Sequence, residues 1–124
     1  MENASIHTIN SILLVDDMED WRMTAKWFLS NFGYLVDSAR TAEEGLELFN
    51  PALHDVVVTD NSMPGMTGLE MAHIIKMRSP STPVLMCTGN PPAEDACVDL
   101  VLQKPVHLLK LREAIVRLLP VKQP

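Results

Sequence analysis

The sequence lacks most features that mark a secreted or membrane-embedded protein. It has only two cysteines in 124 residues, Cys87 and Cys97, so one disulfide is the most it can form. Because Cys87 lies in an apolar run, we interpret it as a small core residue. This argues against a disulfide and favours a reducing compartment for the protein. No apolar stretch approaches the ~20 residues that a membrane-spanning helix needs. Segment 1–11 has neither a basic start nor an apolar centre, which argues against a secretory signal there.

An excess of positive charge is also missing. Ten Lys and Arg residues stand against 16 Asp and Glu, for a formal net charge of −6. This balance argues against sequence-independent binding of nucleic acid or of an anionic membrane, because both require a positive face. What the chain does have is an ordinary globular composition, 47% hydrophobic and 21% charged. We therefore expect a cytoplasmic, soluble domain over 11–120, with a flexible N-terminus (1–10) and a C-terminal tail (121–124).

Five short apolar runs predict β-strands. Runs this short and continuous are typical of strands that are buried on both faces of a parallel sheet. The weakest of them is Tyr34–Val36. The other four are Ile12–Val15, Val56–Val58, Val84–Met86 and Leu100–Leu102.

The segments between these runs have the periodicity of helices. Two capping-box sequences, Thr41–Glu44 and Thr67–Glu70, predict helix starts. Residues 90–99 leave little chain for a crossover, so any helix there must be short. The alternation predicts an α/β fold, a doubly wound five-stranded parallel sheet sandwiched by helices. Apolar stripes with helical spacing are Trp21, Ala25, Phe28 and Phe32, and Leu108, Leu111, Ile115 and Leu118.

Polar residues follow the predicted strands, where a parallel α/β sheet binds its ligands. Carboxylates that share a site repel each other, so a cation is needed to keep all of them ionised. Oxygen ligands favour a hard divalent ion, and Mg²⁺ is the natural candidate. A carboxylate beside Mg²⁺ and a lysine is well placed to attack phosphorus, and a nearby hydroxyl can donate a hydrogen bond to the phosphoryl group. The residues in question are Asp16, Asp17, Asp60, Thr88 and Lys104.

Together these motifs resemble the response-regulator receiver domain of two-component phosphorelay signalling, the CheY-like family with a flavodoxin-like fold. The resemblance extends from about Ser11 to Leu119. It implies that Asp60 accepts a phosphoryl group from a sensor histidine kinase or a histidine phosphotransfer protein, and that an unknown downstream protein responds. The motifs, at successive strand ends, are Leu14–Asp17, Asp60–Pro64 with Gly68, Thr88, and Lys104–Pro105.

The resemblance also implies a role for each site residue. Lys104 would pair with the phosphoryl oxygens, Thr88 would move toward them, and a cis peptide bond would precede Pro105. Mg²⁺ would be held by Asp17, Asp60 and the backbone carbonyl of Ser62, and by Asp16 through water.

Two departures from the family pattern concern the output of the signal. Val101 stands where the family usually has an aromatic residue, three positions before Lys104. The segment from Thr88 to Lys104 is shorter than usual. Neither change touches the phosphorylation chemistry, but both put the usual output face of the family in question.

Two other functions stay open beside a phosphoryl-accepting switch. One is a degenerate receiver that binds proteins without phosphorylation, which Val101 and the short 90–99 segment favour and the complete acidic set disfavours. The other is a phosphatase of the haloacid-dehalogenase type, which also uses an Asp nucleophile with Mg²⁺. Its pattern requires an acidic residue where this chain has Ser62. We expect a switch whose chemistry is limited to self-catalysed phosphotransfer and autodephosphorylation, rather than an enzyme.

Overall fold

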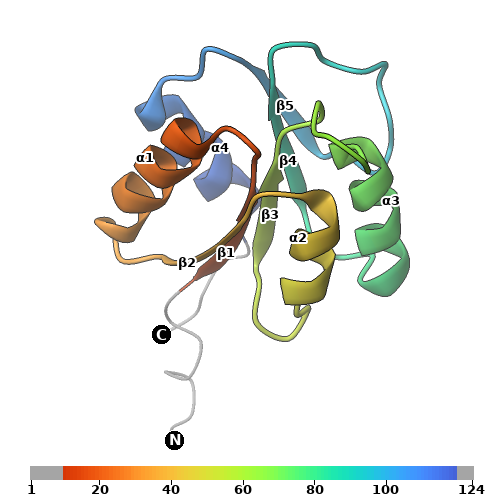
Figure 1. Ribbon diagram of the computed structural model, residues 1–124. Coiled ribbons are helices and arrows are strands. Elements are labelled where there is room, and N and C mark those ends of the chain that lie inside the picture. Colours follow the sequence, from red (N-terminus) through yellow and green to blue (C-terminus); the bar gives the residue numbers. More distant parts are fainter. Residues whose placement is uncertain (1–9, 120–124) are drawn as a thin grey trace, which may run out of the picture.

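A parallel sheet of five strands forms the centre of the computed structural model, which describes residues 10–119 (Figure 1). The strands are β1 (Ser11–Val15), β2 (Leu35–Ala39), β3 (Val56–Thr59), β4 (Val84–Thr88) and β5 (Leu100–Gln103). Their order in the sheet is β2-β1-β3-β4-β5, and each neighbouring pair is parallel. The predicted doubly wound α/β fold is therefore confirmed.

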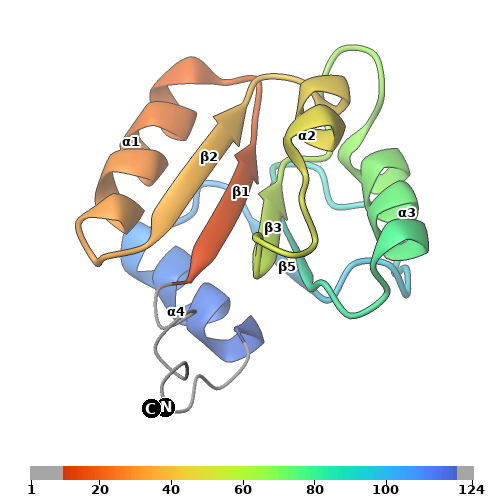
Figure 2. The same cartoon turned by 90° about the horizontal axis from the view of Figure 1, so that it is seen from below.

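Four helices cover the sheet within the described residues, two on each face (Figure 2). They are α1 (Glu19–Ser30), α2 (Ala42–Leu48), α3 (Gly68–Arg78) and α4 (Leu108–Leu118). Helices α1 and α4 pack against one face, and α2 and α3 pack against the other. No helix in this part of the chain is long and apolar enough to cross a membrane.

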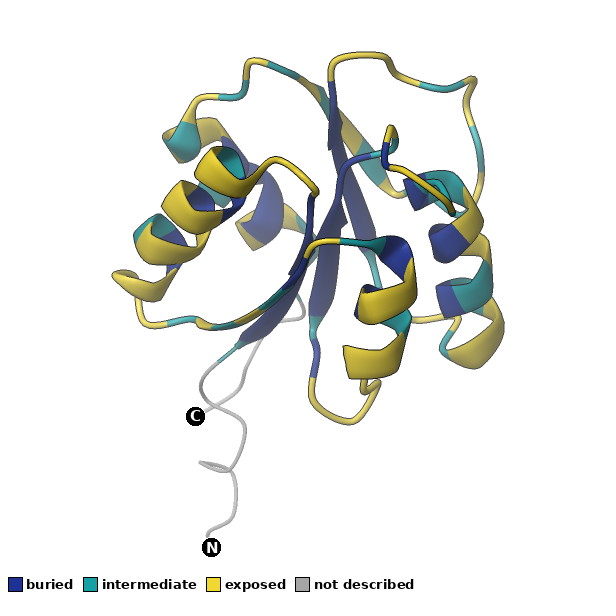
Figure 3. Ribbon diagram, viewed as in Figure 1, coloured by how far each residue is buried: buried dark blue, intermediate teal, exposed yellow. Residues whose placement is uncertain are grey.

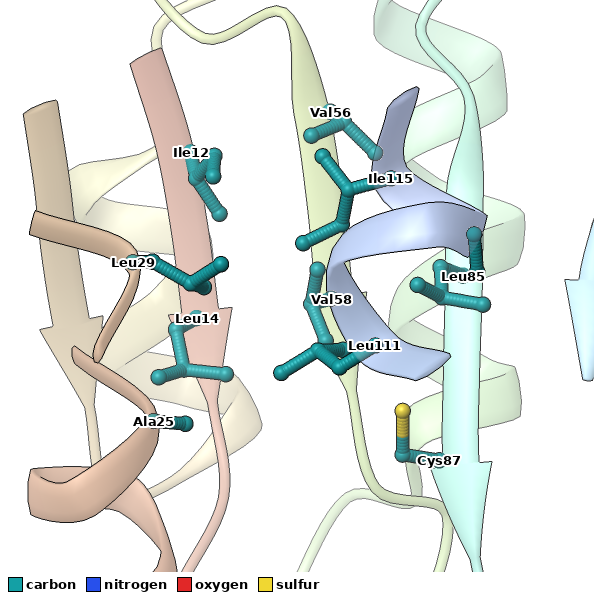
Figure 4. Packing of buried hydrophobic residues seen from close by; sticks show 11 residues of the cluster. Ile12, Leu14, Ala25, Leu29, Val56, Val58, Leu85, Cys87, Leu111 and Ile115 are labelled. Atoms are coloured by element: carbon teal, nitrogen blue, oxygen red, sulfur yellow. The ribbon is translucent and has the colours of Figure 1, made fainter. Parts of the chain in front are cut away.

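The central strands β1, β3 and β4 are buried along their whole length, which explains their unbroken apolar sequences (Figure 3). Successive side chains of a strand point to opposite faces of the sheet. In β1, Ile12 and Leu14 accordingly join the apolar cluster under α1 and α4 (Figure 4). Leu13 and Val15 join the cluster under α2 and α3. The sheet is thus fixed between two apolar layers, which hold its polar strand ends in place.

The end of α1 differs from the prediction. The helix stops at Ser30, so Phe32, predicted in its apolar stripe, lies in the following turn and is exposed. Leu29 is the residue that enters the core instead, together with the predicted Ala25. The chain turns at this point because Gly33 adopts a φ of 92°, which residues with a side chain rarely adopt.

The two predicted capping boxes differ in completeness. At the start of α3, the Thr67 hydroxyl accepts from the Glu70 N–H and the Glu70 carboxylate accepts from the Thr67 N–H, as predicted. At α2, Thr41 also caps the helix through the N–H of Glu44. The Glu44 carboxylate, however, accepts from the backbone N–H of Arg40 rather than from that of Thr41, so this box is only half formed.

The segment between β4 and β5 contains no helix. Residues 89–99 form bends and turns, so the predicted short helix is absent, and Cys97 lies in this loop. The loop passes beside α3 before it enters β5 (Figure 1). Asp99 Oδ2 fixes the end of the loop, because it accepts from Val84 N at 2.7 Å and from Lys76 Nζ at 2.8 Å.

The two predicted flexible ends, 1–10 and 121–124, lie outside the described residues apart from Asn10. The carbonyl of Asn10 accepts a hydrogen bond from the N–H of Leu35, at the start of β2. At the other end α4 stops at Leu118, close to the last described residue.

Candidate functional site

The candidate site lies at the carboxyl edge of the sheet. Asp16 directly follows β1, Asp60 directly follows β3, and Lys104 directly follows β5. Val15 and Thr59 are paired in the parallel ladder, and the N–H of Asp60 donates to the carbonyl of Val15 at 3.1 Å. The register of the sheet therefore brings the two carboxylates side by side.

Lys104 connects the two buried carboxylates. Its Nζ donates to Asp16 Oδ2 at 2.8 Å and to Asp60 Oδ2 at 3.3 Å. Asp16 and Asp60 are only 1% and 6% exposed, whereas Asp17 is open to solvent. Carboxylate oxygens of all three aspartates lie within 4.8 Å of one another. Three carboxylates around one ammonium leave an excess of negative charge, and oxygen donors with an open side suit a partly hydrated Mg²⁺.

Burial shifts the pKa values of Asp16 and Lys104 in opposite directions. Burial raises the pKa of Asp16 above its usual range, although hydrogen bonds from Lys104 and from the Met18 N–H work against this rise. Burial alone would lower the pKa of Lys104. Its hydrogen bond to Asp16 and the negative charges of Asp16 and Asp60 outweigh this effect, so the pKa of Lys104 is raised. Lys104 is therefore a fixed positive charge at neutral pH.

Asp60 is oriented by the turn that follows it. Its Oδ1 accepts from the backbone N–H groups of Asn61 at 2.6 Å and of Ser62 at 3.3 Å, so that Oδ2 faces Lys104. Asn61 in turn accepts from the N–H groups that open α3: its carbonyl from Gly68 and its side-chain oxygen from Leu69. The turn and the helix thus support the same carboxylate.

Gly68, a member of the sequence motif, is required by close approach of the backbone. A Cβ at this position would overlap the carbonyl oxygen of Asp60, which is backbone and cannot move aside. The start of α3 therefore packs directly against the residue at the centre of the site, and only glycine allows this contact.

Thr88 and Lys104 are joined through the backbone of their strands. The carbonyl of Thr88 accepts from the N–H of Lys104 at 2.9 Å, and the following Lys104–Pro105 bond is cis. Thr88 is fully buried, and within residues 10–119 its hydroxyl accepts from the N–H of Asn90 rather than contacting a carboxylate. The structure therefore brings Asp16, Asp17, Asp60 and Lys104 together, with Thr88 on the strand between Asp60 and Lys104.

Three residues near the site were missed by the sequence prediction. Lys104 Nζ lies 5.7 Å from the ring centroid of Trp21 and 3.8 Å from Met18 Sδ. Arg22 is buried, and its guanidinium donates to the carbonyl of Asp16 at 2.7 Å. A signal for Arg22 exists, since it shares the helical spacing of the buried residues Ala25 and Leu29. The Met18 contact has no local signal, because it depends on the position of β5.

The protein with this fold and this acidic edge is a receiver domain of two-component signalling. The family profile of the response regulator receiver domain matches residues 12–116, so the chain belongs to that family. The family resemblance drawn from the sequence is confirmed.

Similar proteins include both kinases and regulators. The chain is 33% identical over 113 residues to the aerobic respiration control sensor protein ArcB of Escherichia coli K12, and 33% identical over 118 residues to the response regulator protein PilR of Pseudomonas aeruginosa. These matches cover 85% and 90% of this chain, but only 14% and 26% of those proteins. The chain therefore spans a minor part of the length of these relatives.

Two solved structures are matched over their whole length. Response regulator TrrA of Thermotoga maritima, solved in complex with Mg²⁺ and BeF, has a TM-score of 0.82 and 30% identity, covering 90% of this chain and 100% of that one. Chemotaxis protein CheY4 of Vibrio cholerae has a TM-score of 0.83 and 31% identity, with the same coverage. These similarities agree with the sheet and helix arrangement described above.

Proposed function

We propose that this receiver, comprising residues 11–120, is a phosphoryl-accepting switch with Asp60 as the acceptor. The observation that carries the proposal is the setting of the Asp60 carboxylate: two backbone N–H groups at Oδ1, and Lys104 at 3.3 Å from Oδ2. In the reaction an Asp60 oxygen attacks the phosphorus of a phosphohistidine. The new O–P bond forms as the P–N bond breaks, and the electron pair of that bond returns to the imidazole nitrogen.

Mg²⁺ is the cofactor that suits this chemistry. Asp17, Asp60 and the backbone carbonyl of Ser62 would hold the ion, with Asp16 acting through water. The donor set supports this assignment, since oxygens of three carboxylates lie within 4.8 Å of one another beside an open side. When bound, Mg²⁺ neutralises the negative charge that collects on the phosphoryl oxygens.

Lys104 and Thr88 complete the proposed switch. Lys104 exchanges its carboxylate partners for a phosphoryl oxygen, because an ammonium held at 2.8 Å from Asp16 can pivot to an anion beside Asp60. Thr88 then gives up the hydrogen bond from the N–H of Asn90, and its hydroxyl donates a hydrogen bond to the phosphoryl group. Since Asn90 lies in the loop 89–99, this exchange changes the surface offered to a downstream protein.

The proposed phosphodonor is a sensor histidine kinase or a histidine phosphotransfer protein. Support comes from the relatives, which include the sensor protein ArcB and the sensor histidine kinase AtsR of Burkholderia thailandensis, 34% identical over 115 residues. A second candidate function is phosphorylation-independent protein binding. It is favoured by the missing helix between β4 and β5 and by Val101, which is 41% exposed on the edge strand.

Intact-mass analysis tests both candidates. The parent, incubated with acetyl phosphate and Mg²⁺, is expected to gain one phosphoryl group, and to gain none when Mg²⁺ is removed by a chelator. Asp60→Asn is expected to gain none under either condition. Asp20→Asn, which removes an exposed carboxylate of α1, serves as the matched control and is expected to behave as the parent does. Full modification of Asp60→Asn would contradict the assignment, and an unmodified parent would favour the second candidate.

A further inference from the structure

A second group of metal-ligating side chains lies outside the acidic site. His73 comes from α3, and Asp95 and Cys97 come from the loop 89–99 that passes beside it (Figure 1). One ligand atom of each residue lies within 4.8 Å of the other two. We propose that these three side chains bind a zinc-type divalent ion, which fastens the loop to α3.

The three side chains form a donor set that differs from the acidic site. Thiolate, imidazole and carboxylate are the ligands that zinc takes in proteins, and three protein ligands with a water in the fourth position are a common arrangement. Mg²⁺ favours oxygen donors and is a poor match for a thiolate. The two groups on this protein therefore select different ions.

The separations are close to those that a tetrahedral ion requires. With zinc bonds of ~2.0–2.3 Å, ligand atoms lie roughly 3.3–3.6 Å apart. His73 Nε2 and Asp95 Oδ2 are now 3.0 Å apart as a hydrogen-bonded pair. The pair would widen by a few tenths of an ångström, and from the 4.8 Å limit the thiol would close by about 1.2 Å to reach the upper end of this range.

Asp95 and Cys97 are already held in one conformation. Asp95 Oδ1 accepts from the N–H of Cys97 at 2.8 Å, and the Asp95 carbonyl accepts from the N–H of Val98 at 3.1 Å. An ion on Oδ2 leaves the bond at Oδ1 in place, so the turn would orient the ligating carboxylate. The adjacent pair of Lys76 and Asp99 keeps the loop against α3 at 2.8 Å. Little further ordering of the loop 89–99 would therefore be needed when an ion binds.

The site is open to an entering ion, and binding would be coupled to the loss of protons. The His73 side chain is 51% exposed, which leaves room for entry of an ion and for a bound water. Burial and the neighbouring Asp95 carboxylate raise the pKa of Cys97, so its thiol carries a proton that the ion must displace to solvent as the S–metal bond forms. His73 Nε2 likewise gives up the proton that it shares with Asp95 as the N–metal bond forms. Cys87 differs, because it is fully buried and its pKa is raised to about 12. It provides an internal control.

Cobalt absorption gives a direct test on the reduced full chain. Excess Mg²⁺ keeps the acidic site filled, and Co²⁺ is added while the thiolate-to-cobalt absorption is recorded. The band is expected in the parent and in Cys87→Ser, to vanish in Cys97→Ser, and to be displaced by Zn²⁺. Removing a ligand in His73→Ala is expected to weaken Co²⁺ binding at least ~10-fold, whereas Glu94→Gln, an exposed carboxylate beside the site, leaves it unchanged. No band at millimolar Co²⁺, or a band that survives Cys97→Ser, would overturn the proposal.

Alkylation of the parent supplies a test that needs no variant. Iodoacetamide is expected to modify Cys97 in the absence of Zn²⁺ and to be slowed at least ~10-fold when Zn²⁺ is present. Peptide mass analysis separates this reaction from that of Cys87, which is expected to stay unmodified in both conditions. Equal alkylation of Cys97 with and without Zn²⁺ would show that His73, Asp95 and Cys97 form only hydrogen bonds.

Discussion

The connections that follow β3 and β4 leave the same edge of the sheet but are held in different ways. The β3–α3 connection is fixed by backbone: Gly68 touches the carbonyl of Asp60, and Asn61 binds two N–H groups at the start of the helix. The β4–β5 connection, residues 89–99, is held against α3 by pairs of side chains. Asp95 is paired with His73, and Asp99 is paired with Lys76. The first connection is suited to keep Asp60, the proposed acceptor, in place. The second connection is suited to move, because few buried contacts must break.

The largest difference in stability is expected when a glycine in each connection is replaced by alanine. Gly68→Ala would put its Cβ on the carbonyl oxygen of Asp60, and we expect it to lower the free energy of unfolding by about 3 kcal/mol. Gly89→Ala has nothing within 4 Å of its Cβ and no positive φ, so it is expected to raise stability by ~0.4–1 kcal/mol. Urea denaturation of both variants measures the difference. Equal effects would mean that the two connections are equally constrained.

A smaller effect is expected at the anchor of the β4–β5 loop. Asp99→Ala removes the acceptor of both Val84 N–H and Lys76 Nζ, and we expect a loss of about 2 kcal/mol. Glu94→Ala changes an exposed carboxylate of the same loop and is expected to stay within about 0.5 kcal/mol of the parent. Thermal unfolding of the pair checks the assignment. A harmless Asp99→Ala would show that the loop does not depend on this anchor.

The buried carboxylate of Asp16, beside Asp60, is expected to lower the stability of the folded chain at neutral pH. Burial raises the pKa of Asp16 in the folded chain above the unfolded value of 3.8, so the folded state favours the protonated form. Below that value Asp16 has no effect, and its cost develops as the pH rises through the raised pKa. Asp16→Asn is therefore expected to be more stable by about 1 kcal/mol at neutral pH without Mg²⁺, and to lose this advantage in acid. Denaturation at several pH values measures it; an advantage that persists below pH 3.8 would contradict the cause.

The smallest energetic change, and the finest test of the comparison, concerns backbone motion. Bound Mg²⁺ with beryllofluoride, a mimic of the phosphoryl group, is expected to slow amide hydrogen exchange in 89–99 more than in 61–69. The reason is that the second segment is already fixed by backbone contacts, whereas the first has order to gain. Hydrogen-exchange mass spectrometry on the parent and on Asp60→Asn gives the measurement and its control. A larger change in 61–69 would reverse the assignment of the two connections.

Most of the fold follows from local sequence. The runs Ile12–Val15 and Val56–Val58 identify strands buried on both faces, and the acidic residues directly after them are placed at one edge by the parallel register. Thr67 and Glu70 identify the start of α3 because a capping box is complete within four residues. Features defined by neighbours in sequence were therefore predictable.

The rest depends on contacts between distant residues. The path of the segment 89–99 is fixed at its end by an anchor that joins Asp99 to Lys76 and Val84, 23 and 15 positions away. No local pattern contains that information. The burial of Arg22 depends likewise on where the chain places the carbonyl of Asp16. A charged residue is ordinarily interpreted as exposed, and only the assembled site overrides that preference.

The contact between Lys104 and Trp21 has an optical consequence. The ammonium lies 5.7 Å from the centre of the indole, close enough for its field to act on the excited state of the ring. Any event that draws Lys104 toward a new anion is therefore expected to change the emission of Trp21. The second indole, Trp27, is 67% exposed on the outer side of α1 and contributes a constant background. We therefore expect Trp21 to serve as an intrinsic fluorescent reporter of occupancy at the acidic edge, readable in real time and without a label.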